Sequence, residues 1–177
     1  VTILELPYIF GVQEGRKPVW VFLVEMIQKM PLVTFFPKGG TAMITVNQVG
    51  QVIASSVETA KGARMIPAGY YNLTWKRMLK IIHKAMGKPK KPIISIPKWI
   101  FKISLIYRQR KLKQNNIESG LNLSLLPKIM AKKAYIDNRY LREILLVKED
   151  NIEQAITDSV KLSLKILNEN HEVVEMK

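Results

Sequence analysis

The amino-acid sequence predicts an α/β fold, and two features of its patterning support the prediction. Runs of β-branched and aromatic residues, which are typical of buried strands, alternate along the chain with segments whose apolar residues recur every three or four positions. Hydrophobic residues make up 47% of the 177 residues, which is enough to build a core. We find no internal repeat and no low-complexity segment, so wholesale disorder is not expected.

The sequence contains no cysteine. This excludes a disulfide framework, a cysteine nucleophile and a cysteine-rich zinc site. It also suits a reducing compartment, and we expect a cytoplasmic protein. No apolar run reaches the roughly 18 residues that a membrane-spanning helix needs.

Strands and helices are expected in turn from the start of the chain. Thr2–Phe10 predicts a buried strand that Pro7 interrupts, because proline cannot donate a hydrogen bond to a sheet. The loop Gly11–Pro18 follows it. Further strands are predicted just before Pro37–Gly40, then at Thr41–Val46, Arg64–Ala68 and Lys91–Pro97. Helices are predicted at Val19–Met30, Gln48–Thr59, Trp75–Met86, Trp99–Lys113 and after Asp150.

Side-chain caps mark where three of these helices should begin. Asn47 is the expected N-cap of the second helix and Thr74 that of the third, because a side-chain oxygen there can accept a free backbone N–H. Asp150 and Glu153 have the spacing of a capping box for the last helix. The expected buried stripes are Val49, Val52, Ile53 and Val57, then Trp75, Met78, Leu79, Ile82 and Met86, then Ile152, Ile156, Val160 and Leu167.

The positive charge of the chain is concentrated in its middle. The formal net charge is +14, and the stretch Thr59–Ile117 holds 15 Lys and Arg but no Asp or Glu. Such a stretch can bind nucleic acid, an anionic membrane or an acidic partner. It can equally be a solvated surface, because its lysines fall between apolar positions at helical spacing.

The residues on their own indicate no catalytic mechanism. The two histidines, His83 and His171, lie far apart in the sequence, and we expect His83 at the surface or the boundary of a helix rather than at a metal. Ser55 and Ser56 lie within a predicted helix with no base nearby in sequence. Gly39-Gly40 predicts only a turn between strands, because no phosphate-binding glycine pattern opens a helix there.

Four segments, in this order and spacing, carry a resemblance to a known family: TILELPYIFG, TAMITVNQVGQVIASSVE, AGYYNLTWKRMLKIIHKAMGK and SIPKWI. Together they resemble the C-terminal half of an extended short-chain dehydrogenase/reductase, the NAD-dependent epimerase/dehydratase family. The resemblance implies the closing strand of a Rossmann sheet and its loop over residues 1–18. It implies a small α/β substrate-binding region over 19–114 and a C-terminal helical segment over 115–177. The N-terminal dinucleotide-binding half is expected to be absent.

The resemblance also implies where ligands would lie. NAD or NADP is the implied cofactor of the parent protein, and we expect neither to bind tightly to this chain alone. The backbone expected beside the nicotinamide is that of Pro7, Tyr8, Ile9, Phe10 and Gly11. The residues expected to flank a small-molecule substrate are Val12, Trp20, Phe36 and Met43. The simpler alternatives are a plain strand-to-loop turn for the first group and core packing for the aromatic and methionine side chains.

Two departures from the family pattern bear on activity. Members that act on nucleotide sugars usually carry an Arg and an Asp at the positions where Thr41 and Gln48 stand here, so we expect a different substrate class. The Gly-rich loop and the catalytic Tyr-x-x-x-Lys pair belong to the first half of such proteins, and we expect this chain to lack both. It would then be catalytically incompetent in isolation.

A second hypothesis is a non-catalytic binding module for nucleic acid or an anionic membrane surface. The stripe Trp99, Ile100, Ile103 and Tyr107, with Arg108, Arg110, Lys111 and Lys113 behind it, is typical of an interfacial helix. That stripe can also be the face that packs on the rest of the protein. A strand left without neighbours would expose an apolar edge, so we expect a homo-oligomer or a partner N-terminal half unless the strand pairs within this chain.

Overall fold

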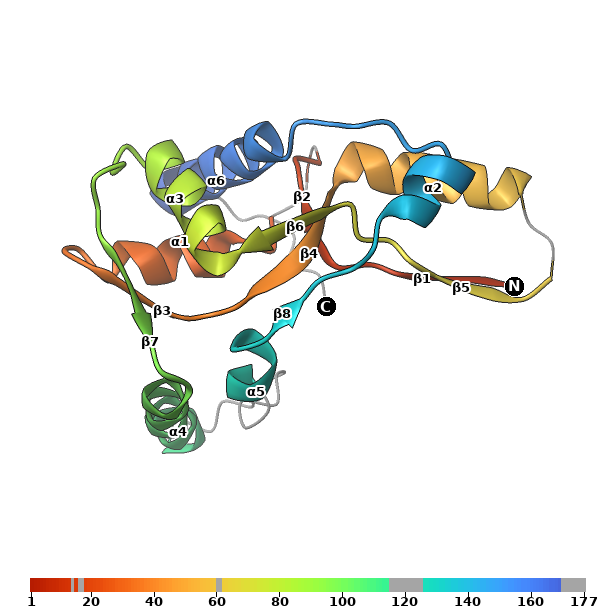
Figure 1. The fold of residues 1–177 in the computed structure, drawn as a ribbon. Coiled ribbons are helices and arrows are strands. Elements are labelled where there is room, and N and C mark those ends of the chain that lie inside the picture. Colours follow the sequence, from red (N-terminus) through yellow and green to blue (C-terminus); the bar gives the residue numbers. More distant parts are fainter. Residues whose placement is uncertain (14, 16–17, 60–61, 115–125, 170–177) are drawn as a thin grey trace.

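The computed structural model describes residues 1–13, 15, 18–59, 62–114 and 126–169 and confirms the α/β class (Figure 1). The strands are β1 (Thr2–Glu5), β2 (Tyr8–Phe10), β3 (Thr34–Pro37), β4 (Gly40–Thr45), β5 (Arg64–Pro67), β6 (Tyr71–Thr74), β7 (Ile93–Ile96) and β8 (Lys133–Ala134). The helices are α1 (Val21–Gln28), α2 (Val46–Glu58), α3 (Trp75–Ala85), α4 (Lys98–Gln114), α5 (Leu126–Met130), the π-helix η1 (Tyr140–Ile144) and α6 (Ile152–Glu169).

Strand β4 lies at the centre of the largest sheet, and every one of its residues is buried. It pairs in parallel with β2 and in antiparallel with β6. Its first two residues, Gly40 and Thr41, also pair in parallel with β8. Because β6 already occupies one edge at those two residues, β8 must share the other edge with β2.

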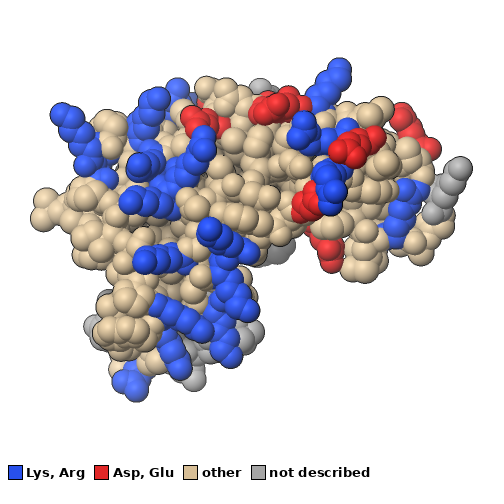
Figure 2. Space-filling view, in the orientation of Figure 1, with Lys and Arg blue, Asp and Glu red and all other residues tan. Residues whose placement is uncertain are grey.

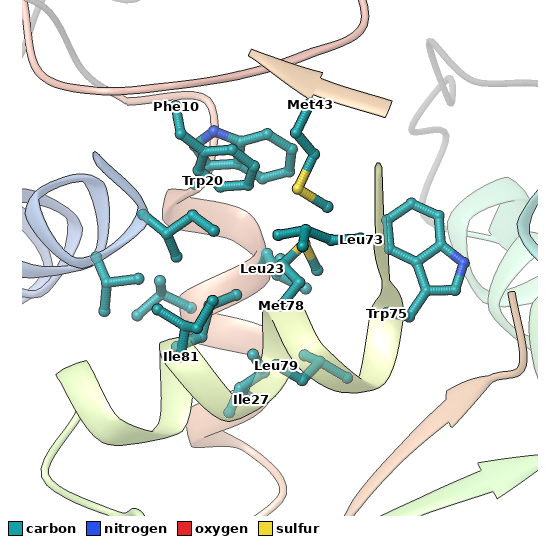
Figure 3. Packing of buried hydrophobic residues seen from close by; sticks show 14 of the residues in the cluster. Phe10, Trp20, Leu23, Ile27, Met43, Leu73, Trp75, Met78, Leu79 and Ile81 are labelled. Carbon is teal, nitrogen blue, oxygen red and sulfur yellow. The ribbon is translucent and has the colours of Figure 1, made fainter. Parts of the chain in front are cut away.

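Two hydrophobic clusters cover the two faces of this sheet. Successive side chains of a strand point to opposite faces, so Met43 packs in one cluster and Ile44 in the other. The first cluster joins β4 to α1, α3 and α6, and Figure 3 shows its side chains from close by. The second cluster joins β4 to α2, β5 and η1. The division into parts at residues 18 and 114 stays a prediction, although Ile156 of α6 packs in the same cluster as Phe10.

The predicted strand Thr2–Phe10 is two strands, because the chain leaves the ladder at Leu6-Pro7. Strand β1 pairs in parallel with β5, while β2 pairs with β4 in a different sheet. The first strand therefore has a neighbour within this chain. The expectation that it is buried is wrong for β1, since Ile3 is 52% exposed and its register partner Met65 is 63% exposed.

Strands β3 and β7 form a separate parallel pair that carries α4. In Figure 1 this helix lies below the rest of the molecule, at the end of β7, with α5 beside it. Among the described side chains of α4, Phe101 and Leu105 are half-buried, whereas Trp99 is 64% exposed. The side chains of Tyr107, Arg108, Lys111 and Lys113 and the segment 115–125 lie outside the described part of the chain.

The helix starts correct two of the predicted caps. Helix α2 begins two residues earlier than expected, and its N-cap is Thr45 rather than Asn47, with Thr45 Oγ1 accepting from Gln48 N–H at 3.2 Å. Helix α6 is capped by Asn151 Oδ1, which accepts from Gln154 N–H at 3.0 Å, so the capping box at Asp150 is wrong. Thr74 is confirmed as the cap of α3.

The apolar stripes are confirmed for α3 and for most of α6 but not for α2. Trp75, Met78, Leu79 and Ile82 are buried, as are Ile152, Ile156 and Val160, whereas Met86 and Leu167 are half-buried. On α2 the expectation is wrong for Ile53 and Val57, which are 48% and 73% exposed. Gln48 and Ser56 are buried in their place. The polar side chain of Gln48 is buried because it makes the capping contacts of α2, and hydrophobic periodicity alone cannot predict this.

His83 is buried and not at the surface, which corrects the prediction from its position on a basic helix. Its Nδ1 lies 3.2 Å from the Lys91 carbonyl oxygen, which can only accept, so Nδ1 carries the proton of the neutral ring. Its Nε2 then accepts from the Thr34 hydroxyl at 3.0 Å. Burial lowers the pKa of His83 below its usual value.

We expect the stability of the protein to fall as the pH drops below about 6.5, by up to about 1.4 kcal/mol per pH unit. The reason is that the unfolded state binds a proton on His83 that the folded state rejects. Urea unfolding at several pH values measures the slope. The variant His83→Gln should lose this slope and His171→Gln should keep it. Equal slopes in His83→Gln and the parent would contradict the assignment.

Gly39 and Gly40 do more than connect two strands of one hairpin, because β3 and β4 belong to different sheets. Gly39 has φ +142°, a conformation that favours glycine, and a Cβ there would lie 2.2 Å from the Met130 carbonyl oxygen. At Gly40 a Cβ would lie 2.5 Å from the Leu73 carbonyl oxygen. The backbone at the end of α5 therefore packs directly on Gly39, and that of β6 packs directly on Gly40.

The variant Gly39→Ala should destabilise the fold by about 3 kcal/mol or more, because backbone and not a flexible side chain stands in the way. Gly87→Ala is the matched control. Gly87 also has a positive φ, of +73°, but nothing lies within 4 Å of an added Cβ. It should cost only about 1 kcal/mol in chemical denaturation. Similar losses in the two variants would show that the close approach at Gly39 is unimportant.

Candidate functional site

The candidate site lies where the parallel strands β2 and β4 end. Ligands of open α/β sheets bind outside the carboxyl ends of such strands, because the chain leaves the sheet there in loops and helix starts. Strand β2 ends at Phe10 and continues into Gly11, while β4 ends at Thr45, directly before α2. Gly11 has φ +141°, and a Cβ there would lie 2.8 Å from Val46 Cγ2. The two chain segments therefore come together at this edge.

An aromatic cluster supports the segment predicted to lie beside a cofactor. The ring of Phe10 stacks on Trp20 with centroids 4.4 Å apart, as Figure 3 shows. Tyr8 stacks on the same indole at 5.3 Å and meets Trp75 edge-on at 5.5 Å. The Trp20 Nε1–H donates to the Ile9 carbonyl oxygen at 2.8 Å. These contacts fix the path of β2 up to Gly11, and Pro7 separates it from β1.

The four residues predicted to flank a substrate are not all in one place. Trp20, Phe36 and Met43 are buried in the first hydrophobic cluster, so core packing accounts for each of them. Val12 is 44% exposed in the loop after Gly11. Phe36 lies beside Trp75 rather than beside Gly11, with their ring centroids 5.8 Å apart. Substrate contact by this set stays a prediction.

A polar cluster at the end of β4 was not predicted from the sequence. The Asp150 carboxylate accepts from Thr45 Oγ1 at 2.6 Å and from Asn47 Nδ2 at 3.4 Å. The Tyr71 hydroxyl donates to the Asp150 carbonyl oxygen and accepts from the Asp150 N–H. Gln48 Nε2 lies 3.3 Å from the same hydroxyl. Asp150 and Thr45 are 105 positions apart, so no local spacing could have indicated the pair.

Helix α6 holds the Gly11 loop directly. The Gly11 N–H donates to Ser159 Oγ at 2.9 Å, and that hydroxyl lies 3.0 Å from the Gly11 carbonyl oxygen. Ser159 is fully buried, which makes this contact part of the packing of α6 on β2. Sequence reasoning missed Ser159 because a serine within a helical pattern indicates nothing about a loop 148 positions earlier.

The ionisable groups of the site have fixed charges near neutral pH. The Thr45 hydroxyl, by donating to Asp150, lowers the pKa of that carboxyl below its usual value. Burial raises the pKa of Tyr71 and that of Tyr8 above their usual values. Asp150 is therefore ionised and both phenols are neutral at pH 7. None of the three titrates where a general acid or base at neutral pH would.

Sequence patterns can suggest a metal site and a catalytic Tyr-x-x-x-Lys pair, and the described residues form neither. Within the described ranges, no group of three or more His, Asp or Glu residues is placed to hold a metal ion. The expectation that the chain lacks a Tyr-x-x-x-Lys spacing is wrong, because Tyr107 and Lys111 have it. Both are on α4, which Figure 1 places well away from β2, and their side chains are outside the described part.

Comparison with known proteins gives structural matches only. No protein-family model and no curated protein sequence matches the chain. Among solved structures it is similar to gox2253, with a TM-score of 0.64 and 14% identity over 93% of this chain and 49% of that one. UDP-N-acetylglucosamine 4-epimerase from Bacillus cereus matches at a TM-score of 0.53 and 12% identity, over 94% of this chain and 48% of that one.

Gre2 from Candida albicans matches at a TM-score of 0.53 and 16% identity, over 93% of this chain and 44% of that one. At these identities the likeness establishes a shared fold. The chain spans about half the length of each of these proteins. It therefore shares its fold with about half of each of these proteins, which agrees with the α/β class that the sequence predicted.

The hydrogen bond between Thr45 and Asp150 should couple the two residues energetically. In a double-mutant cycle of Thr45→Val and Asp150→Asn, we expect a coupling free energy of about 1 kcal/mol from urea unfolding at pH 7. The folded-state pKa of Asp150 lies below its usual 3.8, so this stabilisation is present above that pH and is lost as the pH falls through the folded-state value.

Asp137→Asn is the matched control, because the carboxylate of Asp137 pairs with Arg139 on the surface and makes no contact with Thr45. It should show no coupling to Thr45→Val. A coupling free energy near zero for the Asp150 pair would mean that the contact contributes nothing to the fold.

Proposed function

We propose that this chain is the substrate-binding C-terminal portion of an NAD(P)-dependent oxidoreductase of the epimerase/dehydratase kind. In this proposal it acts together with a dinucleotide-binding half. The observation that carries the proposal is the match to gox2253, which extends over 93% of this chain but only 49% of that protein. The order of the four sequence segments that resemble the C-terminal half of the family supports the same assignment.

The β1–β5 pair offers a surface for the other half. Within the described part of the chain these two strands pair only with each other, so each has an edge without a strand partner. Ile3 and Met65 are opposite each other in register and expose their side chains on one face, while Leu4 and Ile66 pack inward. Exposed apolar edge strands invite further pairing. A larger sheet that continues from this pair would supply partners for its open edges, and a helix packed on that sheet would cover Ile3 and Met65.

The end of β2 is the place where we propose that a nicotinamide cofactor lies. Pro7 separates β2 from β1, and the aromatic stack of Tyr8, Phe10 and Trp20 fixes the path of β2. The Gly11 N–H and carbonyl oxygen already contact Ser159, so Gly11 contributes a fixed loop shape rather than free hydrogen-bonding groups. When bound, the cofactor would supply hydride transfer, and these residues would support the loop beside it.

We propose a substrate other than a nucleotide sugar. Thr41 is buried, and Gln48 is buried with its amide nitrogen 3.0 Å from the Lys148 carbonyl oxygen. A diphosphate is bound best by a guanidinium group, and neither residue offers a charge. The neutral phenol of Tyr71, engaged with the backbone of Asp150, offers no free acid or base. The isolated chain should accordingly have no turnover.

The test starts with the coding sequence upstream of the codon for Val1. If an in-frame upstream segment encodes a Gly-rich turn and a Tyr-x-x-x-Lys pair, that segment and the present chain are expressed separately and are also co-expressed. We expect NAD(P)H binding, followed by cofactor fluorescence, only when both halves are present. Turnover by this chain alone, or an upstream frame without those motifs, would overturn the proposal.

Matched variants test the surface through which the halves associate. Ile3→Lys with Met65→Lys should weaken co-purification of the halves by roughly tenfold or more, because two apolar side chains would no longer be buried. Ile53→Lys with Val57→Lys on α2 changes two exposed apolar residues in the same way. This pair should leave co-purification unchanged. If both double variants lowered co-purification equally, the two halves would associate through another surface.

A further inference from the structure

Helix α4 carries an exposed apolar stripe that the proposed function does not use. Trp99, Ile103 and Ile106 follow one another at four- and three-residue spacing and so share one face of the helix. They are 64%, 59% and 41% exposed. Phe101 and Leu105 lie on the opposite face and are half-buried against the protein. The first half of α4 is therefore apolar on both faces, which is typical of a helix covered on both sides.

We call α4, α5 and the β3–β7 pair the α4 lobe. The described charged side chains around the stripe in this lobe are all positive. Lys98 and Lys102 are exposed beside it, and Arg110 is exposed further along the same face. α5 packs beside α4 and exposes Lys128, and the chain that follows α5 exposes Lys132 and Lys133. In Figure 2 the lobe shows blue side chains, while red ones lie over the upper and right-hand parts of the molecule. A partner that binds this surface must therefore contact apolar side chains and cations together.

We propose that α4 docks on an anionic lipid bilayer, lying in the interface rather than crossing it. No helix of the described ranges is long and apolar enough to cross a membrane. A tryptophan and isoleucines can enter the boundary between headgroups and acyl chains, while lysines reach the anionic headgroups on their long apolar stems. The same lysines argue against a protein partner, because protein interfaces are depleted in lysine.

The exposed isoleucines also argue against nucleic acid as the partner. Binding to a phosphate backbone rests on cations and gains nothing from a row of aliphatic side chains at the surface. The neighbouring β3–β7 pair also exposes apolar side chains. Phe35 of β3 and Ile94 of β7 are register partners and are 50% and 48% exposed. The apolar exposure thus extends from α4 to the adjacent β3–β7 pair, and the positive charge lies on α4, on α5 and just after α5.

Tryptophan fluorescence can report this docking from one residue. Of the three tryptophans, Trp20 and Trp75 are 8% and 4% exposed, so a change of environment on binding must come mainly from Trp99. With phosphatidylcholine vesicles that contain phosphatidylserine, we expect a blue shift and quenching by brominated acyl chains. Vesicles of phosphatidylcholine alone should bind far more weakly, and high salt should weaken binding to the anionic vesicles.

Two double variants separate the effect of the lysines beside the stripe from the effect of net charge. Lys98→Glu with Lys102→Glu should lower the affinity for anionic vesicles by roughly 25-fold or more, at about fivefold for each lysine. Lys76→Glu with Lys80→Glu on α3 makes the same change in net charge at exposed lysines away from the stripe. It should have a much smaller effect. Equal losses in the two pairs would overturn the proposal.

The apolar contribution has its own variant. Ile103→Asn with Ile106→Asn should abolish the blue shift and reduce vesicle sedimentation at least tenfold, with circular dichroism unchanged because both side chains are exposed. Absence of vesicle binding by the parent chain would overturn the proposal. So would tight, salt-sensitive binding to double-stranded DNA that this double variant does not alter, because the surface would then serve nucleic acid.

Discussion

The complete burial of β4 is the constraint on which the rest of the structure depends. A strand that is buried on both faces must have its backbone groups paired within the sheet and its side chains covered on each side. β2, β6 and β8 meet the first need. Met43 and Ile44, pointing to opposite faces, meet the second by nucleating two separate hydrophobic clusters. Helices α1, α3 and α6 pack in the first cluster, and α2 and η1 pack in the second.

The candidate site follows from the same arrangement. Because β2 and β4 are parallel, their carboxyl ends lie at one edge, and the start of α6 comes to that edge from the far end of the sequence. Asp150 joins Thr45, and Ser159 joins Gly11, so that residues from both ends of the chain define one loop region. Asp150 is ionised and Tyr71 is neutral at pH 7, so neither residue exchanges a proton near neutral pH. Proton transfer has to be supplied by other residues.

Two exposed apolar surfaces lie at different ends of the molecule and differ in chemistry. The β1–β5 pair presents open strand edges with Ile3 and Met65, which suits the continuation of a sheet. The α4 lobe presents a helix with lysines beside an apolar stripe, which suits a lipid surface. In the two proposals above, the first surface receives a dinucleotide-binding half and the second contacts a lipid bilayer. Figure 1 shows the two on opposite sides of β4, so that neither blocks the other.

The sequence by itself determined the α/β class, the position of most helices and strands, and the cap at Thr74, because these depend on periodicity and on side chains a few residues apart. The resemblance also implied a ligand at the end of β2, and this stays a prediction. Only the tertiary structure decided that β1 pairs with β5, that His83 is buried, and that Ile53 and Val57 face solvent. It alone brought Asp150 to Thr45 across 105 positions. Burial and long-range hydrogen bonds depend on which surfaces meet, and local pattern carries no information about that.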